Sequence, residues 1–218
     1  MQLPYYIDLL GTLVFAVSGA LAASDKNMYK DIFGVTFTSF VTAVGGGTLR
    51  DMILGVRPTW VVDGNYLIAI TVGVVFAVIF KYYILKHRRT FFLFDTLGIA
   101  LYTVVGVQKS LEFGVSPLAA IILGMFSAVM GGVIRDTLIN EIPLIFRKEI
   151  YATACLSGAA VFVVLKLLKV DDNINSFVSV FVIILIRLIS VKYKLTLPKV
   201  GSRYFSHPSL DPVSSRTL

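Results

Sequence analysis

Two copies of one short motif place charged side chains inside apolar sequence. Residues 46–51 read Gly-Gly-Thr-Leu-Arg-Asp, and residues 131–136 read Gly-Gly-Val-Ile-Arg-Asp. An arginine in the middle of a membrane helix is disfavoured by about 2.5–3.5 kcal/mol on insertion scales, so Arg50 and Arg135 must face protein or water. We expect each arginine to form a buried ion pair or to line a charged constriction on a polar path, and the two roles are compatible.

Aspartates at matching depths are the expected partners of these arginines. Asp8 and Asp95 stand at the starts of two apolar segments, which also makes helix N-capping an alternative role for each. The favoured pairs are Asp8–Arg50 and Asp95–Arg135. Pairing of Arg50 with Asp51 is disfavoured, because adjacent residues on a helix point apart. The second choice of pairs crosses the two copies and comprises Arg50–Asp136 and Arg135–Asp51.

Glycines precede both arginines, as a run at 45–47 and a pair at 131–132. Glycine disfavours an uninterrupted helix by about 1 kcal/mol relative to alanine. One interpretation is close packing, because small residues let membrane helices approach. The other is a helix break that frees backbone carbonyls to line a water-filled path. Because the glycines are duplicated, we favour the break.

Hydroxyl side chains accompany the glycines. Thr42 and Ser127 stand at matching positions and can offer oxygen to a partly dehydrated cation, although such hydroxyls commonly bond their own helix. The predicted path-lining residues are Gly45, Gly46, Gly47, Gly131, Gly132, Thr42, Ser127 and Thr48. The predicted buried charges or gate residues are Arg50, Asp51, Arg135, Asp136, Asp8 and Asp95.

The motifs belong to a repeat that covers most of the chain. Asp-Leu-Leu-Gly at 8–11 returns as Asp-Thr-Leu-Gly at 95–98, an offset of 95 − 8 = 87, and the arginines differ by 135 − 50 = 85. The offset of 85 persists through Pro58/Pro143 and Tyr66/Tyr151. Each copy contains three apolar segments, and an odd number of crossings forces the second copy to enter from the opposite side of the membrane.

Composition places these segments in a membrane. The chain is 56% hydrophobic and 15% charged, with a mean hydropathy of +0.83. Seven segments approach the length that crosses a bilayer as a helix. They are 7–23, 31–54, 66–85, 94–109, 117–139, 151–168 and 177–191. The expected fold is therefore an all-α polytopic membrane protein, with two inverted three-helix repeats (5–86 and 92–169), a seventh helix (174–191) and a polar cytoplasmic tail (192–218).

The placement of basic residues predicts the orientation. Of the 20 Lys and Arg residues, 13 fall on the side opposite the N-terminus, 4 fall on the N-terminal side and 3 lie within segments. By the positive-inside rule the N-terminus lies outside and the C-terminus is cytoplasmic, in a cell inner membrane. This asymmetry accounts for the net charge of +7 without a nucleic-acid partner.

No catalytic arrangement is recognisable in the sequence. Cys155 is the only cysteine, and the two histidines lie in polar connections, so the residues predict neither a metal site nor a nucleophile with its base. We expect no enzyme activity and no cofactor.

In these residues the chain resembles prokaryotic members of the trimeric intracellular cation (TRIC) channel family, which overlaps bacterial proteins labelled glycine transporters. The resemblance covers about residues 5–191 and rests on the doubled Gly-Gly-x-x-Arg-Asp with its downstream proline. It implies glycine kinks in helices two and five and a monovalent-cation pore inside each subunit of a homotrimer. Position 130 is Met instead of a third glycine, so the second kink is expected to be less open. Helix four ends Val-Gln-Lys-Ser at 107–110 and lacks the Lys-Glu-Val stretch of animal members, so their phosphoinositide binding is not expected here.

The expected function is a channel that passes K⁺ and Na⁺ through the kinked halves of segments two and five, with lipids and further copies of the chain as partners. The leading alternative is a secondary transporter for a small zwitterion such as glycine, since helix N-termini beside Arg50 or Arg135 suit a carboxylate. A third possibility is a non-conducting scaffold in which the glycines only pack helices.

Overall fold

The computed structural model describes residues 3–25, 31–85, 89–147 and 150–196, and all of its regular elements in those ranges are helical. The elements are α1 (Leu3–Asp25), α2 (Ile32–Ile53), α3 (Thr59–Val62), α4 (Asn65–Leu85), α5 (Arg89–Glu112), α6 (Pro117–Leu138), the 3₁₀ helix η1 (Leu144–Phe146), α7 (Ala152–Leu167) and α8 (Asp172–Tyr193). Helices α1, α2, α5, α6 and α8 are long and apolar enough to cross a membrane, and α4 and α7 contain shorter apolar stretches. The predicted fold class, two inverted three-helix repeats and a seventh helix, is confirmed.

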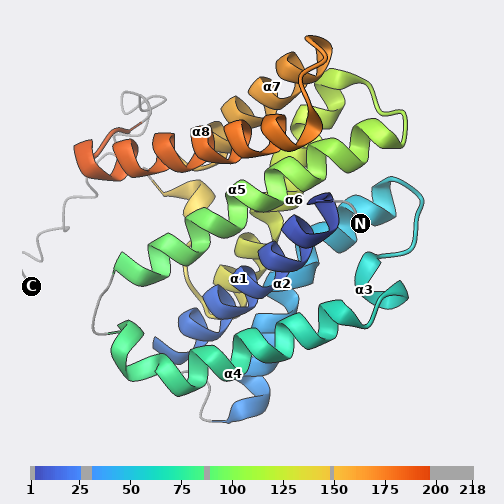
Figure 1. Ribbon diagram of the computed structural model, residues 1–218. Helices are drawn as coiled ribbons and strands as arrows, with labels where there is room; N and C mark the ends of the chain where they lie inside the picture. The colour runs from blue at the N-terminus through green and yellow to red at the C-terminus, as the bar shows by residue number, and fades with distance from the viewer. Residues whose placement is uncertain (1–2, 26–30, 86–88, 148–149, 197–218) are drawn as a thin grey trace, which may run out of the picture.

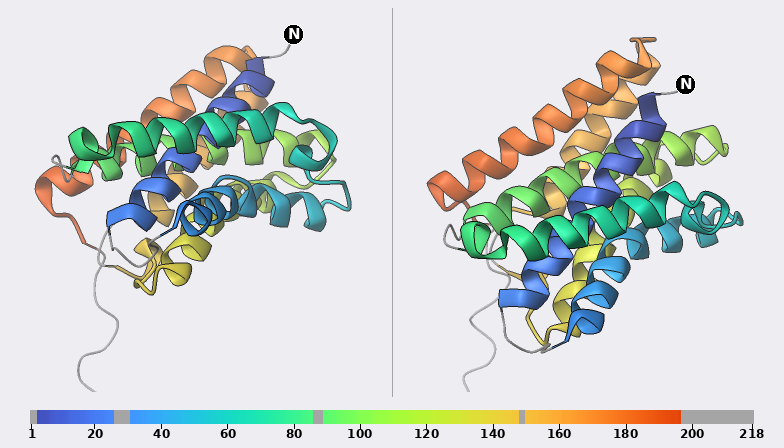
Figure 2. Two further views of the ribbon diagram at one scale, coloured as in Figure 1. Left: turned by 90° about the horizontal axis from the view of Figure 1, so that it is seen from below. Right: turned by 60° about the horizontal axis from the view of Figure 1, so that its bottom comes forward.

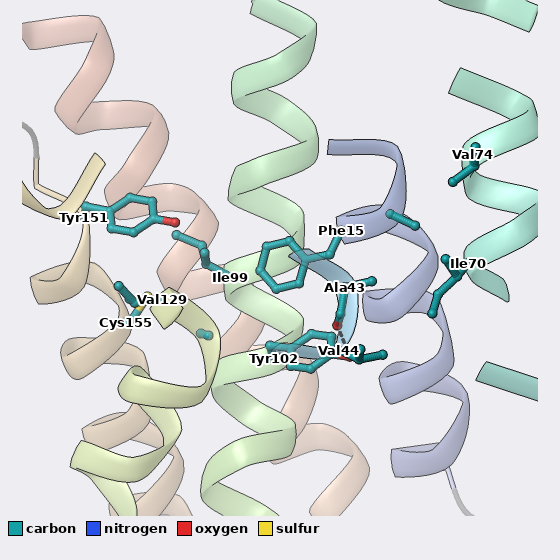
Figure 3. Close-up of a cluster of buried hydrophobic side chains, with 12 residues drawn as sticks. Phe15, Ala43, Val44, Ile70, Val74, Ile99, Tyr102, Val129, Tyr151 and Cys155 are labelled. Carbon is teal, nitrogen blue, oxygen red and sulfur yellow. Dashed lines mark hydrogen bonds between the residues drawn. The ribbon is translucent and has the colours of Figure 1, made fainter. Parts of the chain in front are cut away.

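The helices pack in two rows. In Figure 1, α4, α1, α5 and α8 follow one another across the molecule, and the right-hand view of Figure 2 shows the same order. Helices α2, α6 and α7 form the second row, with α2 against α1 and α6 against α5. The two repeats share one core, because the largest buried apolar cluster takes Phe15 and Ile70 from the first repeat and Ile99, Tyr102 and Tyr151 from the second (Figure 3).

Helix ends follow local sequence signals. Asp31 caps α2 by accepting a hydrogen bond from the Gly34 amide at 3.0 Å. Two residues past their ends, α2 and α6 carry Gly55 (φ 71°) and Asn140 (φ 54°), both in the left-handed conformation that closes a helix. These two residues are 85 positions apart, so the repeat extends to the helix ends.

Three helices begin well before the predicted apolar segments. α1 starts at Leu3 instead of residue 7, α5 at Arg89 instead of residue 94, and α8 at Asp172 instead of residue 177. The predicted N-capping roles are wrong as well, because Asp8 and Asp95 lie inside α1 and α5. Polar residues within these helices do not end them, because neighbouring helices of the bundle provide hydrogen-bond partners for their side chains. Asn175, for example, is buried and donates to the Phe162 carbonyl at 2.9 Å. Most of the predicted tail, from residue 197, lies outside the described residues.

Candidate functional site

The two glycine segments meet where α2 crosses α6. Gly46 faces the backbone carbonyl of Ser127, and Gly131 faces the carbonyl of Thr42, so a Cβ atom on either glycine would overlap a carbonyl oxygen. The two contacts are equivalent under the repeat, because Thr42 and Gly46 stand 85 positions before Ser127 and Gly131. Glycine is needed at 46 and 131 because the two antiparallel backbones touch there.

The predicted helix breaks are wrong. α2 and α6 are each one α-helix over their full length, and in the described residues the glycines with positive φ are Gly55 and Gly114, outside both helices. An uninterrupted helix keeps its carbonyls in its own hydrogen bonds, so the glycines do not free them. Close packing, the interpretation that we did not favour, accounts for Gly46 and Gly131.

The remaining glycines of these segments face side chains instead of backbone, and a Cβ atom on them would make close contacts. The nearest atom to a Cβ would be Ile134 Cδ1 at 3.1 Å for Gly45, Tyr102 Cε1 at 3.4 Å for Gly47 and the Tyr151 hydroxyl at 3.2 Å for Gly132. For Gly132 the next atom is Arg135 Nη2 at 3.6 Å, so polar groups surround this glycine.

The first charge cluster comprises Asp8, Arg50, Asp51 and Lys109. Arg50 and Asp51 are fully buried at the end of α2, and Arg50 Nε and Nη2 lie 2.9 and 2.8 Å from Asp51 Oδ1. Lys109, at the end of α5, places its Nζ 2.9 Å from the same oxygen, and its side chain is 17% exposed. One carboxylate oxygen therefore binds two cationic side chains, of which only the lysine reaches solvent.

Asp8 does not form the predicted ion pair with Arg50. Its Oδ2 accepts the Tyr66 hydroxyl at 2.9 Å, and it interacts with Arg50 and Lys109 only through space in the part of the chain that the structure describes. A tyrosine from α4 thus occupies the position that the arginine was expected to take.

The second charge cluster comprises Asp95, Arg135 and Asp136. Arg135 Nη1 donates to Asp95 Oδ1 at 2.8 Å and to Ser18 Oγ at 2.9 Å, and the Phe91 ring covers its guanidinium at 4.8 Å. Arg135 and Asp95 are fully buried. The predicted pair Asp95–Arg135 is present, and the cross-repeat pairs are not found among the described residues.

Each arginine also binds the aspartate that follows it, which the sequence argument disfavoured. Arg135 Nε lies 2.8 Å from Asp136 Oδ1, as Arg50 does from Asp51. The sequence argument concerned the directions of the Cβ atoms of adjacent helix residues. The guanidinium group lies several bonds beyond Cβ, so the arginine side chain can fold back toward the aspartate. The second oxygen of each aspartate is held by a backbone amide of the next short helix, at Thr59 (3.2 Å) and Leu144 (3.1 Å).

This pairing explains the full motif. Thr59 and Leu144 follow Pro58 and Pro143 directly, so Arg-Asp and the proline eight residues after the arginine form one unit in each repeat. The aspartate joins the end of a long helix to the start of a short one, and the arginine neutralises it.

Arg187 of α8 adjoins the second cluster through Tyr151, which interacts electrostatically with Asp95, Arg135 and Arg187. Arg187 is fully buried, donates to the Ile150 carbonyl at 3.0 Å, and its guanidinium lies 4.8 Å from the Phe92 ring and 4.9 Å from the Tyr151 ring. Lys109 and Arg187 were not singled out from the sequence, because neither has a basic counterpart in the other repeat: Lys109 corresponds to position 109 − 87 = 22, which is alanine, and Arg187 lies in the seventh helix.

The hydroxyls near the glycines are already engaged in part. Thr42 donates to the Thr38 carbonyl at 2.6 Å, and Thr48 accepts from the Trp60 indole at 3.0 Å, so Trp60 packs against α2. Ser127 Oγ is buried without a hydrogen-bond partner in the described part of the chain.

Several other buried polar atoms have no partner within the described ranges. They are Arg50 Nη1, Arg135 Nη2, Asp95 Oδ2 and the Tyr151 hydroxyl. Three of them belong to side chains around Gly132. Buried polar groups of this kind are normally satisfied by ordered water, so the surroundings of Gly132 suit a hydrated site.

Comparison with known proteins identifies the family. A family model described as "Glycine transporter" matches residues 5–82 and 92–166, one block for each repeat. The inner membrane protein YadS of Escherichia coli K12 is 39% identical over 90% of this chain and 96% of its own. A TRIC trimeric intracellular cation channel orthologue from Rhodobacter sphaeroides superimposes with a TM-score of 0.84 at 35% identity, covering 89% of this chain and all of that one. A prokaryotic TRIC channel crystallised in 0.5 M KCl gives 0.80 at 28% identity, covering 89% and 98%. The chain therefore belongs to the glycine transporter family and has the fold of prokaryotic TRIC channels.

Proposed function

We propose that this protein is a channel for monovalent cations, K⁺ and Na⁺, with a path inside each chain along the crossing of α2 and α6. The observation that carries the proposal is the likeness to the cation channel orthologue of Rhodobacter sphaeroides, which spans that whole chain at 35% identity. A fold alone does not determine function, so the proposal also depends on the chemistry of the two charge clusters.

The clusters supply weak cation sites at the two ends of the crossing. The arginines lie near the C-terminal ends of α2 and α6, which run antiparallel, so the clusters lie toward opposite faces of the membrane. In each cluster basic groups contact the carboxylates: Arg50 and Lys109 contact Asp51 in the first, and Arg135 contacts Asp95 and Asp136 in the second. A carboxylate attracts a cation, and the neighbouring basic group prevents tight binding, which a channel requires because ions must leave as readily as they enter.

Lys109 regulates access to the first cluster in this proposal. Its ammonium group lies 2.9 Å from Asp51 Oδ1, where a permeating K⁺ would also bind. We infer that the lysine and the ion compete for this oxygen. The partial exposure of Lys109 lets it leave without unfolding α5.

A potassium-flux assay in proteoliposomes tests both statements. Wild-type protein should carry K⁺ down its gradient, and Lys109→Gln should raise the flux by up to about fivefold, the range of a partly exposed ion pair. Lys166→Gln is the matched control, because Lys166 pairs with Asp172 at an exposed site and should leave the flux unchanged. Equal flux in wild type and Lys109→Gln would reject the competition, and no flux in any variant would reject the channel.

A transporter for glycine is the second candidate, favoured by the description of the family model. Arg50 Nη1 and Arg135 Nη2, unpartnered among the described residues, are donors that suit a carboxylate. Uptake of labelled glycine by the same proteoliposomes distinguishes the candidates. If neither K⁺ nor glycine moves, the non-conducting scaffold becomes the better account.

The proposed setting is the cell inner membrane, where the relative YadS is found by name, with the N-terminus outside and the C-terminus cytoplasmic. The proposed assembly is a homotrimer, and the Rhodobacter sphaeroides relative is described as an orthologue of a trimeric channel. Cross-linking in native membranes should give trimers, and only monomers or dimers would contradict this assembly.

A further inference from the structure

Helices α1 and α5 cross with two aromatic rings in equivalent positions. Phe15 of α1 covers Gly98, and Tyr102 of α5 lies 2.9 Å from a Cβ built on Gly11. The pairs are related by the offset 102 − 15 = 87, and the ring centroids are 5.1 Å apart (Figure 3). The rings therefore have the same packing role in the two repeats, and they differ by one hydroxyl group.

The Tyr102 hydroxyl has both of its hydrogen-bond partners in the helices of the first repeat. Tyr102 donates to the Ala43 carbonyl of α2 at 2.8 Å, drawn as a dashed line in Figure 3, and its oxygen lies 2.8 Å from Thr12 Oγ1 of α1. All three residues are buried. The hydroxyl therefore joins α1, α2 and α5 beside the glycine segment of α2, because residue 43 lies one helical turn before Gly47.

The equivalent site in the second repeat is apolar. Ala43 corresponds to Ala128, but Thr12 and Tyr102 correspond to Ile99 and Phe15. Ile99 and Phe15 have no hydroxyl, so the Ala128 carbonyl has no such hydrogen bond from α1. Arg135 anchors α6 about one turn beyond its glycines, through Asp95 and Ser18, but that contact does not reach residue 128.

We infer that the Tyr102 hydroxyl is a positioning group that fixes the glycine segment of α2, so that helix movement at the α2–α6 crossing takes place in α6. The relevance of this positioning group to conduction rests on the proposed channel, but its role in holding the glycine segment of α2 does not. Loss of one buried hydrogen bond changes a local opening equilibrium by about fivefold. The two glycine segments should therefore differ in their local opening, although their backbones touch.

Hydrogen–deuterium exchange of the purified protein, read by mass spectrometry on peptides covering 43–49 and 128–134, tests this inference. In wild type the α6 peptide should exchange about fivefold faster than the α2 peptide. Tyr102→Phe keeps the ring over Gly11 and should accelerate exchange in 43–49 by the same factor, with 128–134 unchanged. A merely structural loss of packing would accelerate both peptides.

The double variant Phe15→Tyr with Ile99→Thr is the converse test, because it introduces into the second repeat the two hydroxyl groups that the first repeat has. It places a hydroxyl pair opposite Ala128 and should slow exchange in 128–134 to the level of the α2 peptide, and it tests the inference even if Tyr102→Phe fails to fold. Equal exchange of the two peptides in wild type, or no response to either variant, would overturn the inference. The expected exchange pattern without any K⁺ flux would reject the channel and leave the positioning role standing.

Discussion

At the scale of single residues, two equivalent aspartates have different partners. Asp95 binds a guanidinium directly, through Arg135 Nη1 at 2.8 Å, whereas Asp8 binds the uncharged hydroxyl of Tyr66 at 2.9 Å. Removing one member of a buried ion pair leaves a charge without its partner, which is far more destabilising than weakening a neutral hydrogen bond. The two positions should therefore respond differently to the same substitution.

Asp95→Asn should lower the free energy of unfolding by about 3 kcal/mol, the lower end of the range for a broken buried pair, because Asp136 still faces Arg135. Asp8→Asn keeps an acceptor for Tyr66 and should cost about 1 kcal/mol or less. Unfolding of both variants in mixed micelles measures the difference. A loss for Asp8→Asn as large as that for Asp95→Asn would contradict the assignment of partners.

The sequence predicted the burial of these charges but only one of the two partner choices. Burial follows from the repeat and from hydropathy, which are properties of whole segments. The choice of partner depends on residues that the repeats do not share: Ser18, which binds Arg135, is Val105 in the second copy, and nothing in the spacing shows that Tyr66 turns toward Asp8. Side-chain networks of this kind are determined only when all the helices are packed.

At the scale of elements, the crossing of α2 and α6 depends on two glycines that each meet a backbone carbonyl. Their presence was predictable, but their role was assigned incorrectly, since glycine weakens an isolated helix and the sequence does not show the neighbouring backbone. Contact between helices outweighs the propensity of single residues in a packed membrane protein. The helices stay continuous because each glycine is covered by its counterpart helix.

Gly46→Ala and Gly131→Ala should each destabilise the protein by about 1–3 kcal/mol or more, because a backbone carbonyl cannot move aside as a flexible side chain can. Gly64→Ala is the control, since no atom lies within 4 Å of a Cβ built there. Thermal unfolding in detergent compares the three variants. If Gly46→Ala is as stable as Gly64→Ala, the backbone contact is not what keeps glycine at this position.

At the scale of the whole molecule, the two repeats are inverted and the seventh helix breaks their symmetry. α8 packs on α5 and α7 and brings Arg187 beside the second cluster, whereas the first cluster takes Lys109 from α5. The number of helices and their inversion were predictable, because membrane thickness sets segment length and an odd count sets direction. The position of α8 in the bundle was not predictable, since this helix lies outside the repeats and has no equivalent helix to compare it with.

The orientation predicts which loops an impermeant maleimide labels on intact cells. In a Cys155→Ala background, Ser116→Cys between α5 and α6 should react from outside, and Glu141→Cys after α6 should react only in lysed cells. The reason is the excess of basic residues on the side of the C-terminus. The opposite labelling pattern would show that the protein inserts the other way.

The central claim is that one chain provides a path for cations, and recordings in planar bilayers test it most directly. With purified protein and a KCl gradient, the account predicts single-channel currents that reverse near the K⁺ equilibrium potential and do not change when glycine is added to either side. Two results would contradict it: currents that reverse at the Cl⁻ equilibrium potential, or no current from protein that takes up labelled glycine in proteoliposomes.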